Sequence, residues 1–224
     1  MDVAAWEPVY RAIAADLGYD RDADVRARRL ADRHLRPFAV DRLDLSDARV
    51  AVVVGADLDA EGIRRARRAD DVVATGDALT RLEAAGRPPR LVVTDLDSDP
   101  PRSCARTRCG RVVAVHAHGD NRRALRRWLP RMRPSAVLGT TQVHPGPATI
   151  NAGGFTDGDR AAYLADHLGA TELDLVGWDL GDRSVSVEKR RKLDWAARLL
   201  THLEATRGER YGALDGHRAP LRVS

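Results

Sequence analysis

The sequence predicts an α/β fold: a doubly wound, mainly parallel sheet of about six strands with an N-terminal helical cap. Short runs rich in Val or Leu recur after residue 48 without polar alternation, which is typical of strands buried on both faces. Each run is followed by a helical stretch, as crossovers between parallel strands require. Clusters of Asp, His and Gly stand directly after several runs, where the carboxyl ends of parallel strands meet at one edge.

The elements follow from local signals. The first 48 residues predict two helices, one beginning near Pro8 and ending at Gly18, the other running from Asp22 to about Leu35. The predicted strands are Val50–Val54, Asp71–Ala74, Leu91–Val93, Arg111–Val115, Ala136–Leu138 and Leu173–Val176. The predicted helices between and after them are Ala60–Ala69, Ala78–Ala85, Asn121–Leu129, Gly158–Leu168 and Glu188–Ala205.

Two segments carry no such pattern. Pro100–Arg108 is expected to be an irregular surface loop, and Tyr211–Ser224 a mobile tail. We therefore divide the chain into a helical segment at residues 1–48, an α/β domain at residues 49–210 and the tail at residues 211–224.

Composition limits the class of protein. The 224 residues can bury a core without disulfide or metal staples, and Cys104 and Cys109 are too few for a structural zinc site. No apolar run approaches the roughly 20 residues of a membrane span. We expect a soluble, cytoplasmic protein with no membrane partner. The net charge of +4 is a small difference between 37 basic and 33 acidic residues, so it predicts no strong field.

Asp95 and Asp97 follow the third predicted strand in the string TDLDSD. At a spacing of two in extended backbone, their carboxylates point to the same side and can share a hard cation. Mg²⁺ takes one or two carboxylates together with phosphate oxygens of a substrate. The alternative is an Asp-rich turn held by side-chain to backbone hydrogen bonds. The position at a strand end favours a magnesium site.

The string HAHGDN follows the fourth predicted strand. Its histidines, His116 and His118, could bind a transition metal when neutral or phosphate when protonated. Asp120 lies where the next helix is predicted to begin, so it could act in the site or simply cap that helix. The pattern leaves these roles open.

The string GGFTDGDR opens another predicted helix. Thr156 and Asp159 fit a capping box, and Asp157 in the first turn suits the helix dipole. Capping does not account for the residues before them, Gly153 and Gly154, which allow a ligand to approach the backbone, and Phe155, which could stack on a flat heterocycle. A carboxylate here could accept paired N–H donors from a ring edge.

Lys189 and Lys192 are the only lysines in the chain, and they share one face of a predicted helix that follows the string GWDLGD. An amphipathic solvated helix would explain them, with Glu188 and Asp194 as neighbours. Near an acidic crevice they are better explained as phosphate ligands, a usual role of lysine.

Together these strings resemble a known family. The segment ATGDALTRLEAAGRPPRLVVTDLDSD, with HAHGDN, GGFTDGDRAAYLA and GWDLG followed by KRRKLDWAARLL, is similar to the archaeal 6-hydroxymethyl-7,8-dihydropterin pyrophosphokinases over about Val50–Leu200. That family is similar in fold to the catalytic domain of thiamin pyrophosphokinase. The resemblance implies transfer of diphosphate from ATP to the hydroxymethyl group of a reduced pterin, with Mg²⁺ and release of AMP. The product would feed methanopterin or folate-type cofactors.

The resemblance also implies roles for residues. Asp95 and Asp97 match the Asp-x-Asp that holds Mg²⁺, and Asp120 matches a later acid that completes the metal site. The resemblance leaves the histidines open as base, phosphate ligand or metal ligand. Apart from the resemblance, the chemistry would let His116 or His118 accept the alcohol proton and Lys189 and Lys192 hold phosphate oxygens. The segment Gly153–Arg160 resembles the pterin-side loop. The turn Gly55–Asp57 lacks the second glycine of the family, so no phosphate contact is expected there.

Rival functions remain. One is a thiamin pyrophosphokinase-like enzyme with another acceptor. A second is a zinc-dependent hydrolase using His116, His118, His144 and Asp179, although barrel hydrolases with such histidines need about 250 residues and eight strands. The third, a nucleic-acid-binding module, would use the arginine runs but has no use for an acidic crevice, so we expect no nucleic acid partner. Assembly into a homo-oligomer is open.

Overall fold

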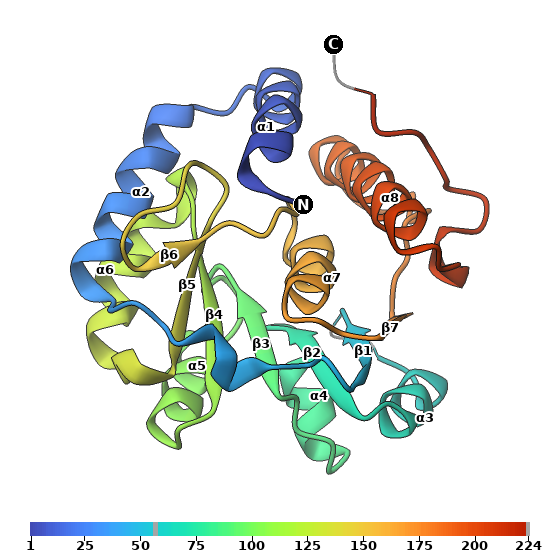
Figure 1. The fold of residues 1–224 in the computed structure, drawn as a ribbon, viewed down its shortest axis with the longest axis horizontal. Helices are drawn as coiled ribbons and strands as arrows, with labels where there is room; N and C mark the ends of the chain where they lie inside the picture. Colours follow the sequence, from blue (N-terminus) through green and yellow to red (C-terminus); the bar gives the residue numbers. More distant parts are fainter. Residues whose placement is uncertain (56–57, 223–224) are drawn as a thin grey trace.

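The computed structural model describes residues 1–55 and 58–222, and it confirms the predicted α/β class (Figure 1). Its single sheet is parallel throughout and has seven strands in the order β6-β5-β4-β3-β2-β1-β7. The strands are β1 (Arg49–Val53), β2 (Asp71–Thr75), β3 (Leu91–Thr94), β4 (Val112–Ala117), β5 (Val137–Thr141), β6 (Thr149–Ile150) and β7 (Glu172–Val176). The sequence pattern missed β6 because two residues show no periodicity.

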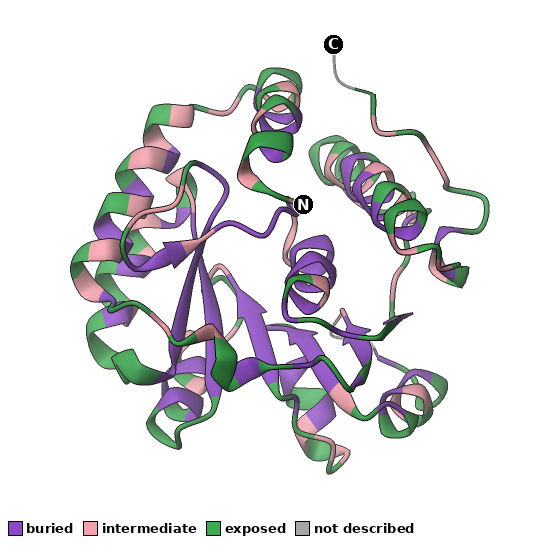
Figure 2. Cartoon of the chain, viewed as in Figure 1, coloured by how far each residue is buried: buried purple, intermediate pink, exposed green. Residues whose placement is uncertain are grey.

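Alternate residues of each strand face two helical layers, and the strands are buried throughout the middle of the molecule (Figure 2). One layer consists of α2 (Arg21–His34), α3 (Ala60–Arg68), α4 (Leu79–Ala84), α5 (Pro100–Arg108) and α6 (Arg122–Trp128). The other consists of α1 (Val3–Leu17), α7 (Asp157–His167) and α8 (Val187–Arg207). In β1, for example, Val50 and Val52 pack in the second layer while Ala51 and Val53 pack in the first.

Two local expectations are corrected. Helix α1 begins at Val3 rather than near Pro8, because Asp2 caps it by accepting a hydrogen bond from the Ala5 amide at 2.8 Å. Pro100–Arg108 is the helix α5 rather than an irregular loop. Its prolines occupy the first turn, where a missing N–H costs nothing, and Asp99 caps it through the Arg102 amide at 3.1 Å.

The two ends of the chain contact the α/β unit. Trp6, Tyr10 and Ile13 of α1 belong to the same apolar cluster as β1. Near the carboxyl end, Tyr211 and Leu214 are buried, and Leu214 lies in the 3₁₀ turn η5 (Gly212–Leu214). The division at residue 48 and the mobility of the tail stay predictions. The last two residues of the tail and the last two of the turn Gly55–Asp57 lie outside the described residues.

Within residues 1–55 and 58–222, no helix combines the length and apolar character that a membrane crossing needs.

The topology brings separate elements to one edge. All seven strands run in the same direction, so the residues that follow β1, β2, β3, β4, β5 and β7 lie at the same edge of the sheet. The amino ends of α7 and α8 and the turn between α1 and α2 contribute residues to the cavity at this edge. The candidate site lies there.

Candidate active site

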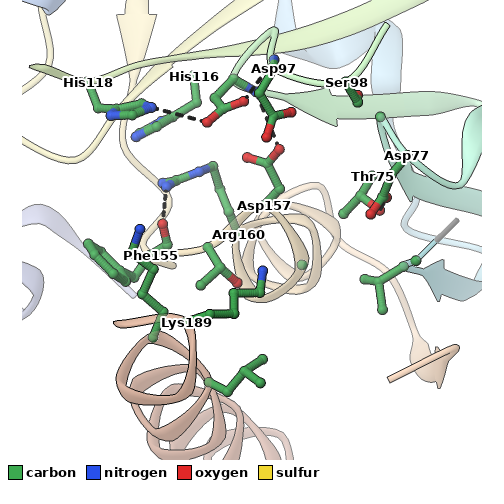
Figure 3. A pocket seen from close by; sticks show the side chains of 18 of the residues that line it. Thr75, Asp77, Asp97, Ser98, His116, His118, Phe155, Asp157, Arg160 and Lys189 are labelled. Atoms are coloured by element: carbon green, nitrogen blue, oxygen red, sulfur yellow. Dashed lines mark hydrogen bonds and ion pairs between the residues drawn. The ribbon is translucent and has the colours of Figure 1, made fainter. Parts of the chain in front are cut away.

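A cavity of about 490 Å³ lies at the carboxyl edge of the sheet. Figure 3 shows the acidic and histidine side chains on its wall and Lys189 pointing in from α8. Of the site residues predicted from sequence, those that line it are Asp95, Asp97, His116, His118, Asp120, Phe155, Thr156, Asp157, Lys189 and Lys192. Gly153, Gly154 and Asp159 do not line it.

Three carboxylates converge in this cavity. Asp95, Asp97 and Asp157 each offer an oxygen within 4.8 Å of the other two. In the described part of the chain, no other three His, Cys, Asp or Glu side chains meet this condition. Asp157 comes from the first turn of α7, and its carboxylate accepts a hydrogen bond from the Asp95 amide at 3.3 Å. An arrangement of oxygen ligands suits a hard divalent cation.

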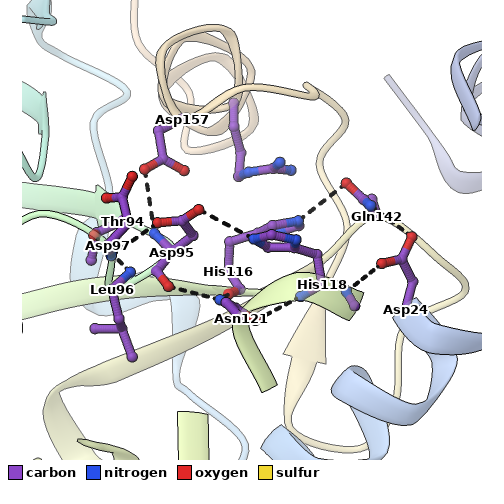
Figure 4. Close-up of polar contacts among 12 residues, drawn as sticks. Asp24, Thr94, Asp95, Leu96, Asp97, His116, His118, Asn121, Gln142 and Asp157 are labelled. Atoms are coloured by element: carbon purple, nitrogen blue, oxygen red, sulfur yellow. Dashed lines mark hydrogen bonds and ion pairs between the residues drawn. The ribbon is translucent and has the colours of Figure 1, made fainter. Parts of the chain in front are cut away.

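The backbone after β3 is shaped to present two of these carboxylates. Leu96 between them has a φ of 70°, in the left-handed region that non-glycine residues rarely enter. The Leu96 amide donates to the Thr94 hydroxyl at 3.0 Å, and the Asp97 amide donates to Asp95 at 3.1 Å. Asn121 donates to the Asp95 carbonyl at 2.8 Å (Figure 4). Strained backbone of this kind persists where the surroundings hold it, commonly at functional sites.

The electrostatics of the cluster favour the binding of a positive charge. Burial and the neighbouring Asp95 charge raise the pKa of Asp157 to about 7. The same causes raise the pKa of Asp97 to about 6. Burial also acts to raise the pKa of Asp95, but hydrogen bonds with His118 and Asp97 outweigh it and leave that pKa lowered. A divalent cation would relieve the repulsion that the raised pKa values report.

Asp120, the acid expected to complete the metal site, does not lie with Asp95 and Asp97. It lines the cavity and is exposed, but it is not one of the three converging carboxylates. The structure brings Asp157 to that position instead. Asp157 had been expected in the pterin-side loop. Sequence spacing could not distinguish the two acids, since each follows a turn at the same sheet edge.

The two histidines are placed differently. His116 is 1% exposed, with Nδ1 at 3.2 Å from the Thr140 hydroxyl and Nε2 at 3.3 Å from the Gln142 side-chain oxygen. Burial, reinforced by the Arg160 charge, lowers the pKa of His116 well below its ordinary value. His118 is partly exposed, and its Nε2 lies 3.2 Å from Asp95 Oδ2. His116 is thus held by two neutral side chains, while His118 faces the carboxylates.

The segment Gly153–Asp159 is fixed from within. Asp159 is fully buried and accepts from the Phe155 amide at 2.6 Å and the Thr156 amide at 2.8 Å, which confirms the capping box. Gly154 has a φ of 84°, and a Cβ there would lie 2.3 Å from the Arg160 Cα. Arg160 donates to the Gly154 carbonyl at 2.9 Å and to the Phe155 carbonyl at 2.5 Å. Two of the predicted binding residues, Gly154 and Asp159, therefore shape the wall.

An aromatic pair and the lysines form the opposite side. Tyr19, from the turn between α1 and α2, lies 6.0 Å from the Phe155 ring. Lys192 lies 5.6 Å from the Tyr19 ring centre and pairs with Glu188 at 2.7 Å. Lys189 is exposed at the cavity edge. Both lysines line the cavity, as two residues on one helix face should.

Sequence reasoning missed the lining residues Tyr19, Thr75, Asp77 and Gln142, and it included Arg160 and Trp178 only as members of the strings GGFTDGDR and GWDLGD. Asp77 lies two residues after the end of β2, so the strand-end rule could have found it. Gln142 directly follows β5 and could have been found in the same way. Tyr19 lies outside the predicted α/β unit, and no local signal marks it as part of a site.

The histidine set of a zinc hydrolase is not assembled. His144 is exposed, with its Nδ1 at 3.1 Å from the Pro145 carbonyl. Both ring nitrogens of His116 have protein partners. The described residues provide a cluster of carboxylates rather than of imidazoles.

Comparisons with known proteins agree with this geometry. The family described as 6-hydroxymethylpterin diphosphokinase MptE-like matches residues 42–185. A 6-hydroxymethyl-7,8-dihydropterin pyrophosphokinase of Methanothermobacter thermautotrophicus is 37% identical, over 91% of this chain and 96% of its own length. A relative with the same name from Pyrococcus furiosus is 34% identical over 89% of this chain and 93% of its own length. Another, from Methanocaldococcus jannaschii, is 29% identical over 91% of this chain and 96% of its own length.

The family match spans most of the α/β unit, including Asp95, Asp97, His118 and Asp157, and the relatives extend the likeness to nearly the whole chain. The chain therefore belongs to the MptE-like 6-hydroxymethylpterin diphosphokinase family.

Proposed function

We propose that this protein is a 6-hydroxymethyl-7,8-dihydropterin pyrophosphokinase that uses ATP as the diphosphate donor. The observation that carries the proposal is the likeness to three relatives of that name over about nine tenths of the chain. The pterin hydroxymethyl oxygen would form a bond to the β-phosphorus of ATP. The bond from that phosphorus to the oxygen bridging to the α-phosphorus would break, AMP would leave with that oxygen, and the alcohol would lose its proton.

Asp95, Asp97 and Asp157 would hold Mg²⁺, since three carboxylate oxygens within 4.8 Å of one another fit a small hard cation. When bound, Mg²⁺ supplies positive charge that offsets the negative charge of the polyphosphate. We assign the third ligand to Asp157 because it converges with the other two. Asp120 remains a lining residue at the exposed rim of the cavity.

The lysines would bind the polyphosphate from the other side. Lys189 and Lys192 line the same cavity as the carboxylates, and lysine binds phosphate as a point charge. Acids on one wall and bases on the other leave room between them for a polyphosphate with its cation. Attack on phosphorus needs such positioning more than covalent help from the protein.

His118 is the better placed of the two histidines to take the alcohol proton. Its Nε2 lies 3.2 Å from Asp95 and would donate to that carboxylate, which leaves Nδ1 to take the proton, and its side chain is partly exposed and lines the cavity. Both ring nitrogens of His116 are already bonded inside the protein. A general base must come within hydrogen-bond reach of the proton that it removes.

The reduced pterin would lie against the aromatic pair. Phe155 and Tyr19 line the cavity together and offer apolar surface to a flat ring. Asp159 is unsuited to accept N–H donors from the pterin because backbone amides already occupy its oxygens. A cytoplasmic site of action agrees with the two free cysteines, Cys104 and Cys109, and the product would enter methanopterin or folate-type cofactor synthesis.

The test incubates the purified protein with ATP, Mg²⁺ and 6-hydroxymethyl-7,8-dihydropterin and separates the nucleotide products by chromatography. AMP formed only with the pterin, and lost in Asp97→Ala, is the expected result. ADP in place of AMP would show transfer of a single phosphate and contradict the proposal. Diphosphate transfer to thiamin but not to the pterin would contradict the acceptor alone.

A further inference from the structure

A buried hydrogen-bond network connects the N-terminal helices to the wall of the cavity. Asp24 of α2 is 3% exposed, and three donors meet its carboxylate. Oδ1 accepts from the Gly119 amide at 2.6 Å, and Oδ2 accepts from the Gln142 side-chain amide at 2.7 Å. The Tyr10 hydroxyl of α1 also donates to Oδ2. These partners come from three separate parts of the chain, and two of them adjoin the cavity.

The carboxylate determines how Gln142 is oriented. The Asp24 carboxylate accepts from the Gly119 amide and the Tyr10 hydroxyl, and the amide NH₂ of Gln142 faces it as a third donor. The Gln142 oxygen then faces His116 Nε2 at 3.3 Å, as Figure 4 shows. An oxygen there requires a proton on Nε2. His116 is therefore the Nε2–H tautomer, and its Nδ1 accepts from the Thr140 hydroxyl at 3.2 Å.

Both arms of the network end at the segment that carries His118. One arm holds the Gly119 amide directly, at the first residue of η2 (Gly119–Asn121). The other fixes His116, whose ring stacks on that of His118 with centroids 5.7 Å apart. His118 in turn contacts Asp95. The position of His118 beside the carboxylates thus depends on a residue of the second helix.

We propose that Asp24 is a positioning residue, which orients Gln142, fixes the Nε2–H tautomer of His116 and holds the Gly119 turn so that His118 faces Asp95. The role in turnover rests on the proposed function, whereas the tautomer does not. Residues that orient metal ligands through hydrogen bonds typically contribute about 10–100-fold to metal affinity or activity, and we expect an effect of the same order here.

Asp24→Asn gives a specific expectation because the new side chain has one possible orientation. Its oxygen must accept from the Gly119 amide, so its NH₂ faces Gln142. Gln142 must then turn its oxygen to residue 24 and its NH₂ to His116 Nε2, which becomes an acceptor. The His116 proton would move to Nδ1 and point at Thr140. Gly119, Gln142 and His116 keep partners, and the Tyr10 hydroxyl changes from donor to acceptor at the new NH₂. The protein should therefore fold, with some loss of stability, and the tautomer should switch.

The experiment records imidazole ¹⁵N spectra of the metal-free protein labelled at histidine, with the His116 signals assigned by their loss in His116→Gln. The wild type should show the Nε2–H pattern and Asp24→Asn the Nδ1–H pattern. The pyrophosphokinase kcat of Asp24→Asn should fall about 10–100-fold. In the double variant Asp24→Asn with Gln142→Glu, the new carboxylate accepts from both neighbours, so the Nε2–H pattern and most of the kcat should return.

Asp22→Asn is the matched control, since Asp22 is an exposed acid on the same helix. It should change neither the tautomer nor kcat. An Nδ1–H pattern in the wild type would overturn the orientation argument, even if no variant folded. A switched tautomer in Asp24→Asn with unchanged kcat would overturn the positioning role. If no pterin or thiamin activity exists at all, the proposed function fails, while the ¹⁵N spectra still decide the tautomer.

Discussion

Replacing Asp157 by Asn tests which acid completes the proposed metal site. A cation between oxygens that are at most 4.8 Å apart lies closer than that distance to each of them. Two unit charges 4 Å apart interact by about 4 kcal/mol at an effective dielectric constant of ~20. At about 1.36 kcal/mol per decade, losing one such charge would cost roughly three decades in kcat/KM. The Asn oxygen can still bind weakly, so we expect a loss of about 100–1000-fold.

The assay is AMP release at several Mg²⁺ concentrations, with Asp120→Asn as the paired variant. Asp120 lies at the exposed rim outside the three converging carboxylates, so its replacement should change kcat/KM by less than about fivefold, as expected of screened surface charges. Equal losses in the two variants, or a near-normal Asp157→Asn, would refute the assignment. A loss only in Asp120→Asn would support the ligand set that the family resemblance implied.

Asp157→Asn should also make the metal-free protein more stable. Burial and Asp95 raise the folded-state pKa of Asp157 to about 7, above its unfolded value near ~4. Its ionisation at pH 8 therefore opposes folding, and the penalty disappears below the unfolded pKa. Asp157→Asn removes this penalty, so Tm at pH 8 without Mg²⁺ should rise. A fall in both Tm and activity would indicate damage to the fold rather than loss of a ligand.

Three further predictions follow from the site. Mg²⁺ affinity, measured by calorimetry, should fall as the pH drops from about 8 to about 5.5, because burial and Asp95 raise the pKa values of Asp157 and Asp97 to about 7 and about 6, and protons then compete with the cation. A pH-independent affinity would argue against these ligands. Asp159→Ala should lower the free energy of unfolding in urea by about 1–3 kcal/mol, because two amides lose their acceptor; an unchanged midpoint would contradict this. Lys189→Met should raise the KM for ATP about tenfold, as the loss of one charged hydrogen bond implies. The control variant Arg190→Met, at a residue outside the cavity, should leave the KM for ATP unchanged.

Local pattern was a good guide to the sheet. The six predicted strands are all present because each run of Val and Leu is long enough to show burial on both faces. Proline was a weaker guide, since it suits both an irregular loop and the first turn of a helix. Pro100–Arg108 forms a helix because Asp99 caps its amino end.

The sequence alone determined that acids, histidines and lysines would meet at one edge, because parallel strands deliver their carboxyl ends there regardless of detailed packing. Only the tertiary structure decided which of them touch. Asp157 reaches Asp95 across 62 residues of chain, and Asp24 reaches Gln142 across 118. Such contacts depend on how α7 and α2 pack against opposite faces of the sheet, and strand periodicity does not specify that packing.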